Sequence, residues 1–439
     1  MNLDAHLTLP VALGDGLVMR WATAADAPAV AAFNLAMHSD NPAEPEEGLS
    51  IWTYDLFSGQ HPTTGPGDFT VVVDDQGQIV SSLCLISQTW AIDGLAFGVG
   101  RPELVATLPE YRRRGLVRRQ MAVVHSLSAA RGELVQVITG IPWYYRQFGY
   151  EMTVDLGGSR DFVWSRPGNS PPVTEEPYRF RPATADDIPH LAALYAIHCQ
   201  ASLVYRVRSQ AEWLYELTLQ DPAAVNGQRF GMVETPAGEI AGYVEYAIWS
   251  RSVNIREVAA RPGHSLRALC LFLTRHFKPT PLPSGAPADH LTFRLGTAHP
   301  AYTALGRQLS KPDNAYAYFL RVPDLPAFLR HLAPVLERRL AGSVMAGHTG
   351  TLRLNFYQQQ LTLRFDTGRL AEIGTFQPAY AHDGDACLPD LTFLHLLFGH
   401  RSLEQLRQLR VDCFAANAET AVLLDVLFPT RPSYPVTLS

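Results

Sequence analysis

One segment of the chain combines an apolar strand, a basic loop that contains a glycine, and the start of a helix. It runs Leu104-Val105-Ala106-Thr107-Leu108-Pro109-Glu110-Tyr111-Arg112-Arg113-Arg114-Gly115-Leu116-Val117. A loop of this kind presents free backbone N–H groups at a helix N-terminus, where an anion is stabilised. The adjacent arginines would add charge-assisted contacts to phosphate. The segment therefore predicts a pyrophosphate-binding loop; the alternative is an ordinary strand-to-helix turn with solvated arginines.

A second segment is rich in tyrosine and follows a predicted apolar strand over residues 134–138. It runs Thr139-Gly140-Ile141-Pro142-Trp143-Tyr144-Tyr145-Arg146-Gln147-Phe148-Gly149-Tyr150-Glu151. A tyrosine phenol close to a leaving thiolate can protonate it. Tyr144 and Tyr145 are both candidates, because adjacent residues need not face the same way. Both could instead pack in the core with hydrogen-bonded hydroxyls.

The chain also contains a weak internal repeat. Residues 20–28 and 181–189 share Arg, Ala-Thr-Ala, Asp and Pro in one register, and an Asp three residues after the Thr predicts a capping box in each copy. The match returns at Val105-Ala106-x-x-Pro109 and Val258-Ala259-x-x-Pro262. There the second copy replaces Arg112, Arg113 and Gly115 by Ser265, Leu266 and Ala268. If the copies share a fold, only the first should bind the anion.

Proline density marks residues 166–177 as a linker, and the sequence pattern changes after about residue 321. Residues 352–356 and 361–365 alternate with period two, which predicts a β-hairpin. Asp390 is a predicted N-cap for an apolar helix that ends at Gly399, and Ser402 with Gln405 predicts a further capping box. These features predict three domains, over residues 1–165, 178–322 and 323–439.

Composition restricts the class of protein and its partners. The 439 residues are 47% hydrophobic and 18% charged, with a net charge of -6, which is typical of a multidomain globular chain and argues against nucleic acid as a partner. The five cysteines are scattered without a C-x-x-C pair, which indicates reduced thiols and no metal site. The start lacks signal-peptide features, and no apolar run could cross a bilayer. We therefore expect a cytoplasmic protein.

The loop core Arg112-x-x-Gly115 resembles the acetyl-CoA loop of the GNAT N-acetyltransferases. Together with the Tyr145-x-x-Phe148-Gly149-Tyr150 segment, the degenerate second copy and the α+β tail, the chain resembles the Eis (enhanced intracellular survival) family. The resemblance implies an α+β fold with tandem GNAT folds, each a mixed central sheet flanked by helices, and then a domain like sterol carrier protein. It also implies acetyl-CoA as co-substrate and a homo-oligomer, with a hexamer as the candidate assembly.

The resemblance assigns roles to particular residues. Tyr145 takes the place of the catalytic acid, and the α-carboxylate of Ser439 takes the place of the base, although this chain lacks the aromatic C-terminus of the best-studied members. Val117 departs from the family pattern, in which Gly or Ala permits the closest approach to the pyrophosphate. The residues expected to contact acetyl-CoA are Leu104, Val105 and Thr107 along pantetheine, and Arg112, Arg113, Arg114, Gly115, Leu116 and Val117 around the pyrophosphate.

Two functions stay open at this point. The first is an enzyme that moves an acetyl group from acetyl-CoA directly to a primary amine of a small molecule or a lysine; no cysteine has an activating neighbour for an acyl-enzyme. The second is a non-catalytic CoA- or lipid-binding regulatory protein that kept the GNAT fold. The sequence does not identify the amine. Four acidic residues could attract a cationic amine or form a solvated loop: Asp40, Glu44, Glu46 and Glu47.

Overall fold

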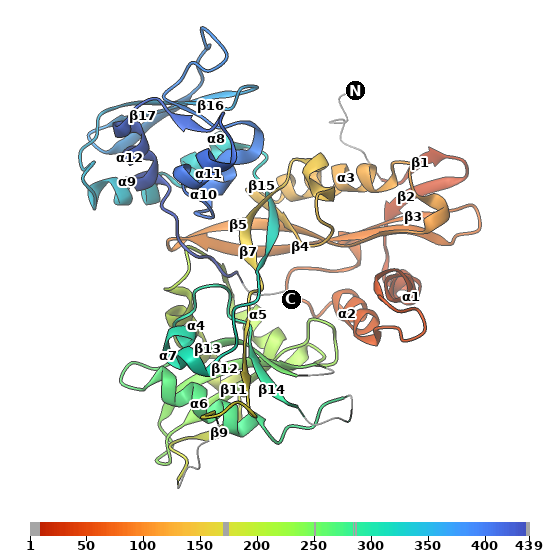
Figure 1. Ribbon diagram of the computed structural model, residues 1–439. Coiled ribbons are helices and arrows are strands. Elements are labelled where there is room, and N and C mark those ends of the chain that lie inside the picture. Colours follow the sequence, from red (N-terminus) through yellow and green to blue (C-terminus); the bar gives the residue numbers. More distant parts are fainter. Residues whose placement is uncertain (1–8, 170–174, 250–251, 284, 286–287, 436–439) are drawn as a thin grey trace.

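The computed structural model describes residues 9–169, 175–249, 252–283, 285 and 288–435. In Figure 1 these residues form three sheets with helices packed on them, the first at upper right, the second at the bottom and the third at upper left. All five cysteines are buried and unpaired. Among the described residues, no helix combines the length and the apolar character needed to span a membrane.

The first sheet has the strand order β1-β2-β3-β4-β5-β6-β15-β7, and β10 also pairs with β4. Helix α3 packs on one face of this sheet, and α1 and α2 pack on the other (Figure 1). Both faces are buried, so side chains alternate between two cores: Leu83 and Leu85 lie under α3, and Cys84 and Ile86 lie under α1 and α2. The elements are β1 (Val11–Gly14), β2 (Leu17–Trp21), β3 (Phe69–Val73), β4 (Ile79–Ile92), β5 (Leu95–Thr107), β6 (Val135–Ile138), β7 (Glu151–Leu156), β10 (Val204–Val207), β15 (Tyr316–Arg321), α1 (Ala27–His38), α2 (Glu47–Phe57) and α3 (Leu116–Ala130).

The second sheet has the order β8-β14-β13-β12-β11-β9. It repeats the antiparallel strands and the flanking helices of the first sheet on a smaller scale. Its elements are β8 (Arg160–Val163), β9 (Arg179–Pro182), β11 (Arg229–Glu234), β12 (Ile240–Ile248), β13 (Val253–Ala260), β14 (His290–Phe293), α4 (Ile188–Cys199), α5 (Gln210–Leu214), α6 (Leu266–Phe277) and α7 (Pro300–Leu305).

The internal repeat is visible in how the first helix of each copy begins. The Asp26 carboxylate accepts hydrogen bonds from the Thr23 amide at 2.7 Å and the Thr23 hydroxyl at 2.9 Å, and Arg20 pairs with the same carboxylate. Asp187 repeats this arrangement with its own threonine and arginine. The two predicted capping boxes are therefore confirmed.

The two repeated sheets exchange strands. β8, which follows the first copy in the chain, pairs with β14 of the second sheet. β15, which follows the second copy, inserts between β6 and β7 of the first sheet. The range 1–165 thus supplies β8 to the second sheet, and the range 178–322 supplies β10 and β15 to the first sheet. The domain ranges stay a prediction.

The third sheet has the order β18-β17-β16-β19-β20. The predicted hairpin is confirmed, because β16 and β17 pair in antiparallel register from Gly350 with Phe365 to Asn355 with Gln360. The elements are β16 (Gly350–Asn355), β17 (Gln360–Asp366), β18 (Arg369–Gly374), β19 (Ala386–Cys387), β20 (Phe414–Ala415), α8 (Leu325–His331), α9 (Ala333–Ala341), α10 (Phe393–Leu397), α11 (Leu403–Leu409) and α12 (Ala418–Leu427).

One helix start in the third unit differs from the prediction. Asp390 has a φ of 53° and lies in a 3-10 turn, and α10 begins three residues later with Thr392 as its N-cap. The prediction of Asp390 as the N-cap was wrong because the chain makes a tight turn there before entering the helix. The capping box at Ser402 and Gln405 is confirmed, with the Ser402 amide donating to Gln405 Oε1 at 2.9 Å.

Candidate active site

Strand β5 leaves part of one edge open. Its parallel ladder with β6 contains only Val99 with Val135 and Gly100 with Gln136, whereas β5 continues to Thr107. The register with β4 shifts between Ser82 and Cys84, and Leu104 at this bulge has a φ of 53°. Beyond Gly100, β5 therefore diverges from β6 and can offer backbone groups to an extended ligand.

The loop after β5 positions the start of α3. Gly115 is the N-cap of α3 and has a φ of 75°, a conformation that glycine adopts without strain. It carries no side chain to cap the helix, so the first amide groups of α3 stay available to a ligand. Arg112 Nε donates to the Thr107 carbonyl at 3.2 Å and Arg114 stacks on Tyr111 at 4.9 Å, which holds both arginines on the loop.

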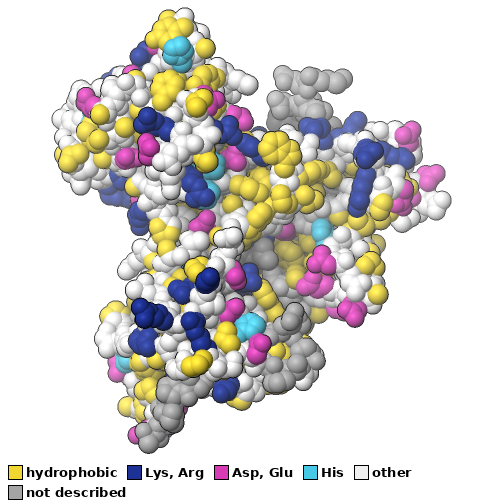
Figure 2. All heavy atoms as spheres, viewed as in Figure 1, with side chains coloured by type: hydrophobic (Ala, Val, Ile, Leu, Met, Phe, Trp, Pro, Cys, Tyr) yellow, Lys and Arg dark blue, Asp and Glu magenta, His cyan; other side chains and the backbone are white. Residues whose placement is uncertain are grey.

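A cleft of about 700 Å³ joins these features. Of the predicted residues that the structure describes, two are not part of its lining: the Leu104 side chain is buried in the core, and Arg114 stacks on Tyr111. Figure 2 shows hydrophobic side chains gathered across the middle of this face, beneath α3, with basic side chains to their right. The predicted residues that line the cleft are Val105, Thr107, Arg112, Arg113, Gly115, Leu116, Val117 and Tyr145.

Tyr145 lies in a 3-10 turn, residues Tyr144–Phe148, at the end of this cleft. Its ring is 5% exposed and packs edge-on against Phe319 at 5.6 Å and Tyr144 at 5.1 Å. Its hydroxyl makes no hydrogen bond to any residue that the structure describes. Burial, and then the carboxylate of Glu103, raise the pKa of this phenol. Tyr145 is therefore a protonated phenol with a free hydroxyl; Tyr144 also lines the cleft and stays the alternative.

The structure adds two residues that the sequence analysis missed. His38, the last residue of α1, lines the cleft, and its Nε2 atom is buried without a hydrogen-bond partner in the described part of the chain. Glu103 lies beside the β5 bulge, is paired with Arg101, and acts electrostatically on both His38 and Tyr145. No local motif could have identified them, because α1 and the bulge meet only through the fold.

The acidic residues considered as an amine-attracting group lie on the connection from α1 to α2. All of them are exposed, and none forms an ion pair with a described residue: Asp40, Glu44, Glu46 and Glu47. Glu47 begins α2, where a carboxylate also stabilises the helix N-terminus. Their position is compatible with either interpretation made from the sequence.

The second copy closes the corresponding anion site with its own residues. Helix α6 begins after Ser265, and the Ser265 hydroxyl accepts from the Ala268 amide at 3.2 Å. The side chain thus satisfies an amide group that Gly115 leaves open in the first copy.

The second copy also retains a tyrosine that the sequence comparison did not detect. Tyr302-x-x-Leu305-Gly306 follows β14 as Tyr145-x-x-Phe148-Gly149 follows β6. The Tyr302 hydroxyl accepts from the Leu295 amide at 2.9 Å and donates to the Phe293 carbonyl at 2.9 Å. The second tyrosine is therefore held by backbone groups, whereas the hydroxyl of the first is free.

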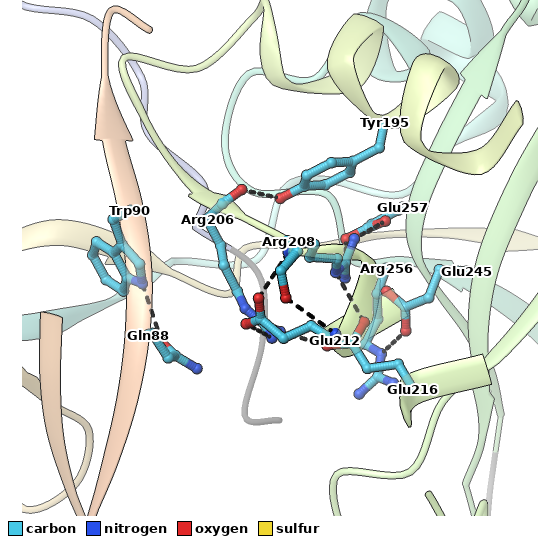
Figure 3. A network of polar contacts seen from close by, with 11 residues as sticks. Gln88, Trp90, Tyr195, Arg206, Arg208, Glu212, Glu216, Glu245, Arg256 and Glu257 are labelled. Atoms are coloured by element: carbon cyan, nitrogen blue, oxygen red, sulfur yellow. Dashed lines mark hydrogen bonds and ion pairs between the residues drawn. The ribbon is translucent and has the colours of Figure 1, made fainter. Parts of the chain in front are cut away.

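Buried ion pairs fill the interior of the second copy where it meets the first sheet (Figure 3). Arg206 contacts Glu212 at 2.8 Å and Glu216 at 2.6 Å. Arg208 contacts Glu216 at 2.9 Å and Glu257 at 2.7 Å, and these three side chains have no exposed surface. Glu257 lies on β13, the counterpart of β5, so the second copy uses this strand for internal pairing.

Ser439, the predicted base, lies outside the described residues, which end at Pro435. The segment before it is held by several bonds: the Leu203 amide donates to the Pro432 carbonyl at 2.8 Å, and the Tyr434 hydroxyl donates to the Arg294 carbonyl at 2.6 Å. These bonds hold the described end of the chain against residues of the range 178–322.

Three solved structures share the fold at low sequence identity. A conserved protein of unknown function from Enterococcus faecalis V583, titled a probable N-acyltransferase, has a TM-score of 0.68 at 17% identity and covers 95% of this chain and 97% of that chain. A GCN5-related N-acetyltransferase from Kribbella flavida has a TM-score of 0.64 at 19% identity, with coverage of 95% and 97%. Eis1 from Mycobacterium abscessus has a TM-score of 0.60 at 16% identity, with coverage of 96% and 99%.

The comparisons by sequence match a smaller part of the chain. No curated protein sequence matches the chain. The family model described as acetyltransferase (GNAT) domain matches residues 22–153, a range that includes β5, the loop to α3 and Tyr145. The expected fold class, an α+β chain with GNAT-like mixed sheets flanked by helices, is confirmed. Residues 22–153 of the chain therefore match a GNAT acetyltransferase domain.

Proposed function

We propose that the chain is an acetyl-CoA-dependent N-acetyltransferase that moves the acetyl group directly to a primary amine of a small molecule or of a lysine. One observation carries this proposal: a single cleft contains the open edge of β5, the uncapped start of α3 and the free hydroxyl of Tyr145. The open edge of β5 supports a pantetheine site, and the uncapped start of α3 supports a pyrophosphate site. The hydroxyl of Tyr145 supports a proton donor.

The backbone of β5 would hold the acetyl-CoA arm. Val105 and Thr107, with the backbone of Leu104, would bond pantetheine as an additional strand. The amides of Leu116 and Val117 would meet the pyrophosphate at the start of α3. Arg112 and Arg113 line the same end and would neutralise its charge, while Arg114 would contribute at longer range.

The proposed reaction is a direct transfer. The amine nitrogen forms a bond to the acetyl carbon, the bond from that carbon to sulfur breaks, and Tyr145 donates its proton to the leaving thiolate. A cysteine nucleophile is disfavoured, because the Cys84 thiol on β4 is fully buried and burial raises its pKa. The Eis resemblance offers the Ser439 carboxylate as the group that removes the proton from the amine.

The remaining assignments belong to the same proposal. Residues 1–165 form the acetyl-CoA-binding domain, residues 178–322 a degenerate copy without a cofactor loop, and residues 323–439 a domain like sterol carrier protein. The protein is cytoplasmic and a homo-oligomer, with a hexamer as the candidate. An amine with further positive charge would suit the acidic connection between α1 and α2.

Two assays test the proposal together. Acetyl-CoA should raise the melting temperature of the protein, since it binds the folded state. A panel of polyamines, aminoglycosides and lysine peptides should then identify an amine that releases CoA. Stabilisation by acetyl-CoA without CoA release for any amine would favour the alternative, a non-catalytic CoA-binding regulatory protein. Absence of stabilisation would reject the enzyme and the CoA-binding form of the alternative, and would leave its lipid-binding form.

A further inference from the structure

The direct transfer needs a group that accepts a proton from the amine, and the cleft itself offers one. Its titratable side chains are Tyr111, Arg112, Arg113, Arg118, Tyr144, Tyr145 and His38. Arginine stays protonated at neutral pH and tyrosine ionises only near pH 10 or above, so neither type accepts a proton from an ammonium group. Among the described residues that line the cleft, only the imidazole of His38 can do so.

We infer that His38, rather than the Ser439 carboxylate that the Eis resemblance offers, is the catalytic proton acceptor for the amine, an inference that rests on the proposed N-acetyltransferase function. The helix α1 ends at His38 and directs it into the cleft that also contains Tyr145. Its Nε2 atom is buried and makes no hydrogen bond to the described residues, so this nitrogen is free to take a proton.

The surroundings of His38 suit a group that changes charge during a reaction. Burial lowers the pKa of the His38 imidazole and keeps it neutral before the reaction. The charge of the Glu103 carboxylate and a hydrogen bond with the Leu104 backbone act in the opposite direction and raise this pKa. Glu103 also acts on the Tyr145 phenol. One carboxylate thus neighbours both groups, at the bulge where β5 diverges from β6.

The degenerate copy lacks an equivalent. Continuing the register of the repeat, Cys199 takes the position of His38. His198, one residue earlier, is buried with its ring 5.0 Å from that of His299. The second copy has therefore lost the basic loop and has a cysteine, not an imidazole, at the position of His38.

The proton balance of the step is complete. His38 takes one proton from the ammonium group, and the neutral nitrogen attacks the acetyl carbon. The carbon–sulfur bond breaks, and Tyr145 gives its proton to the thiolate. The nitrogen loses a second proton that restores Tyr145, and His38 releases the first to solvent. The products are the amide, CoA thiol and one proton.

The test uses the full chain with His38→Ala and the milder His38→Gln, and His190→Ala as the matched control. His190 is an exposed imidazole on α4, away from the cleft. We expect kcat to fall at least about 100-fold in both His38 variants and to stay unchanged in the control. Added imidazole should restore part of the activity of His38→Ala, a rescue that a merely structural histidine would not show.

Stabilisation by acetyl-CoA separates this inference from the proposed function. If the His38 variants keep that stabilisation and lose turnover, the inference stands. If no variant, wild type included, releases CoA from any amine, the proposed function fails first. Two results would overturn the inference. One is unchanged turnover in both His38 variants. The other is a loss of turnover in these variants that imidazole does not restore, together with an equal loss when Ser439 is removed.

Discussion

The paired tyrosines of the two copies permit a prediction with a built-in control. Removing one hydroxyl from Tyr145 leaves its packing against Phe319 and Tyr144 in place and breaks no hydrogen bond to a described residue. The free energy of unfolding should therefore change by less than about 0.5 kcal/mol. Turnover should fall by about 10²–10⁴, which is about 2.7–5.4 kcal/mol in the activation barrier, because the thiolate must leave without a proton donor.

Removing the hydroxyl of Tyr302 should lower the stability of the protein and leave its turnover unchanged, the opposite of the result expected for Tyr145. That hydroxyl bonds the Leu295 amide and the Phe293 carbonyl in a buried site, so Tyr302→Phe leaves two backbone groups without their partner. The cost should be about 1–3 kcal/mol of stability, with no effect on kcat.

The two variants are compared by urea unfolding and by CoA release with a single amine. The expected result is a crossed pattern, in which Tyr145→Phe is stable and slow and Tyr302→Phe is less stable and fast. If Tyr145→Phe turns over at the wild-type rate, Tyr145 is not the acid, and Tyr144→Phe becomes the next variant to measure. If both variants lose turnover equally, the distinction between an active and a degenerate copy is wrong.

Three further predictions concern the loop, the buried ion pairs and pH. Arg112→Ala should raise the KM for acetyl-CoA about 10-fold or more, because one charge-assisted contact is lost. Arg267→Ala at the start of α6 should leave this KM unchanged. Steady-state kinetics measure both variants, and an equal rise in KM in both would contradict the assignment. Glu216→Ala should cost about 3–5 kcal/mol in urea unfolding, because two buried arginines lose a partner, and a cost under 1 kcal/mol would contradict this account of the network. The hydrogen bond from Arg181 lowers the pKa of Asp187 to about 2, below its usual 3.8, so this carboxylate adds stability above about pH 4 that is lost as the pH falls towards 2. Asp187→Asn should lower stability by about 1 kcal/mol at pH 7, given the half-exposed Arg181, and this difference should shrink in acid; a constant difference from pH 7 to pH 2 would refute the argument.

Local patterns in the sequence predicted local structure well. The capping boxes at Thr23, Thr184 and Ser402 formed because each depends on residues three positions apart. The hairpin at residues 352–365 followed from alternation. The basic loop and the tyrosine segment fall in one cleft because both follow neighbouring strands of one sheet.

Features that depend on distant parts of the chain were not predictable in this way. The exchange of β8 and β15 between sheets joins strands far apart in sequence, and no local pattern specifies the partner of a strand. His38 and Glu103 become neighbours only when α1 packs on β5. Asp390 has the residue type of an N-cap, but the chain enters the helix after a turn with a left-handed residue.

A crystal structure with CoA bound would show whether the first copy alone holds the cofactor. We expect one CoA in each chain, with pantetheine along Val105–Thr107 of β5 and the pyrophosphate at the amides of Leu116 and Val117, and with its sulfur near the Tyr145 hydroxyl. An empty cleft in the first copy at saturating CoA, or a pyrophosphate at the Ser265 end of α6, would contradict this expectation.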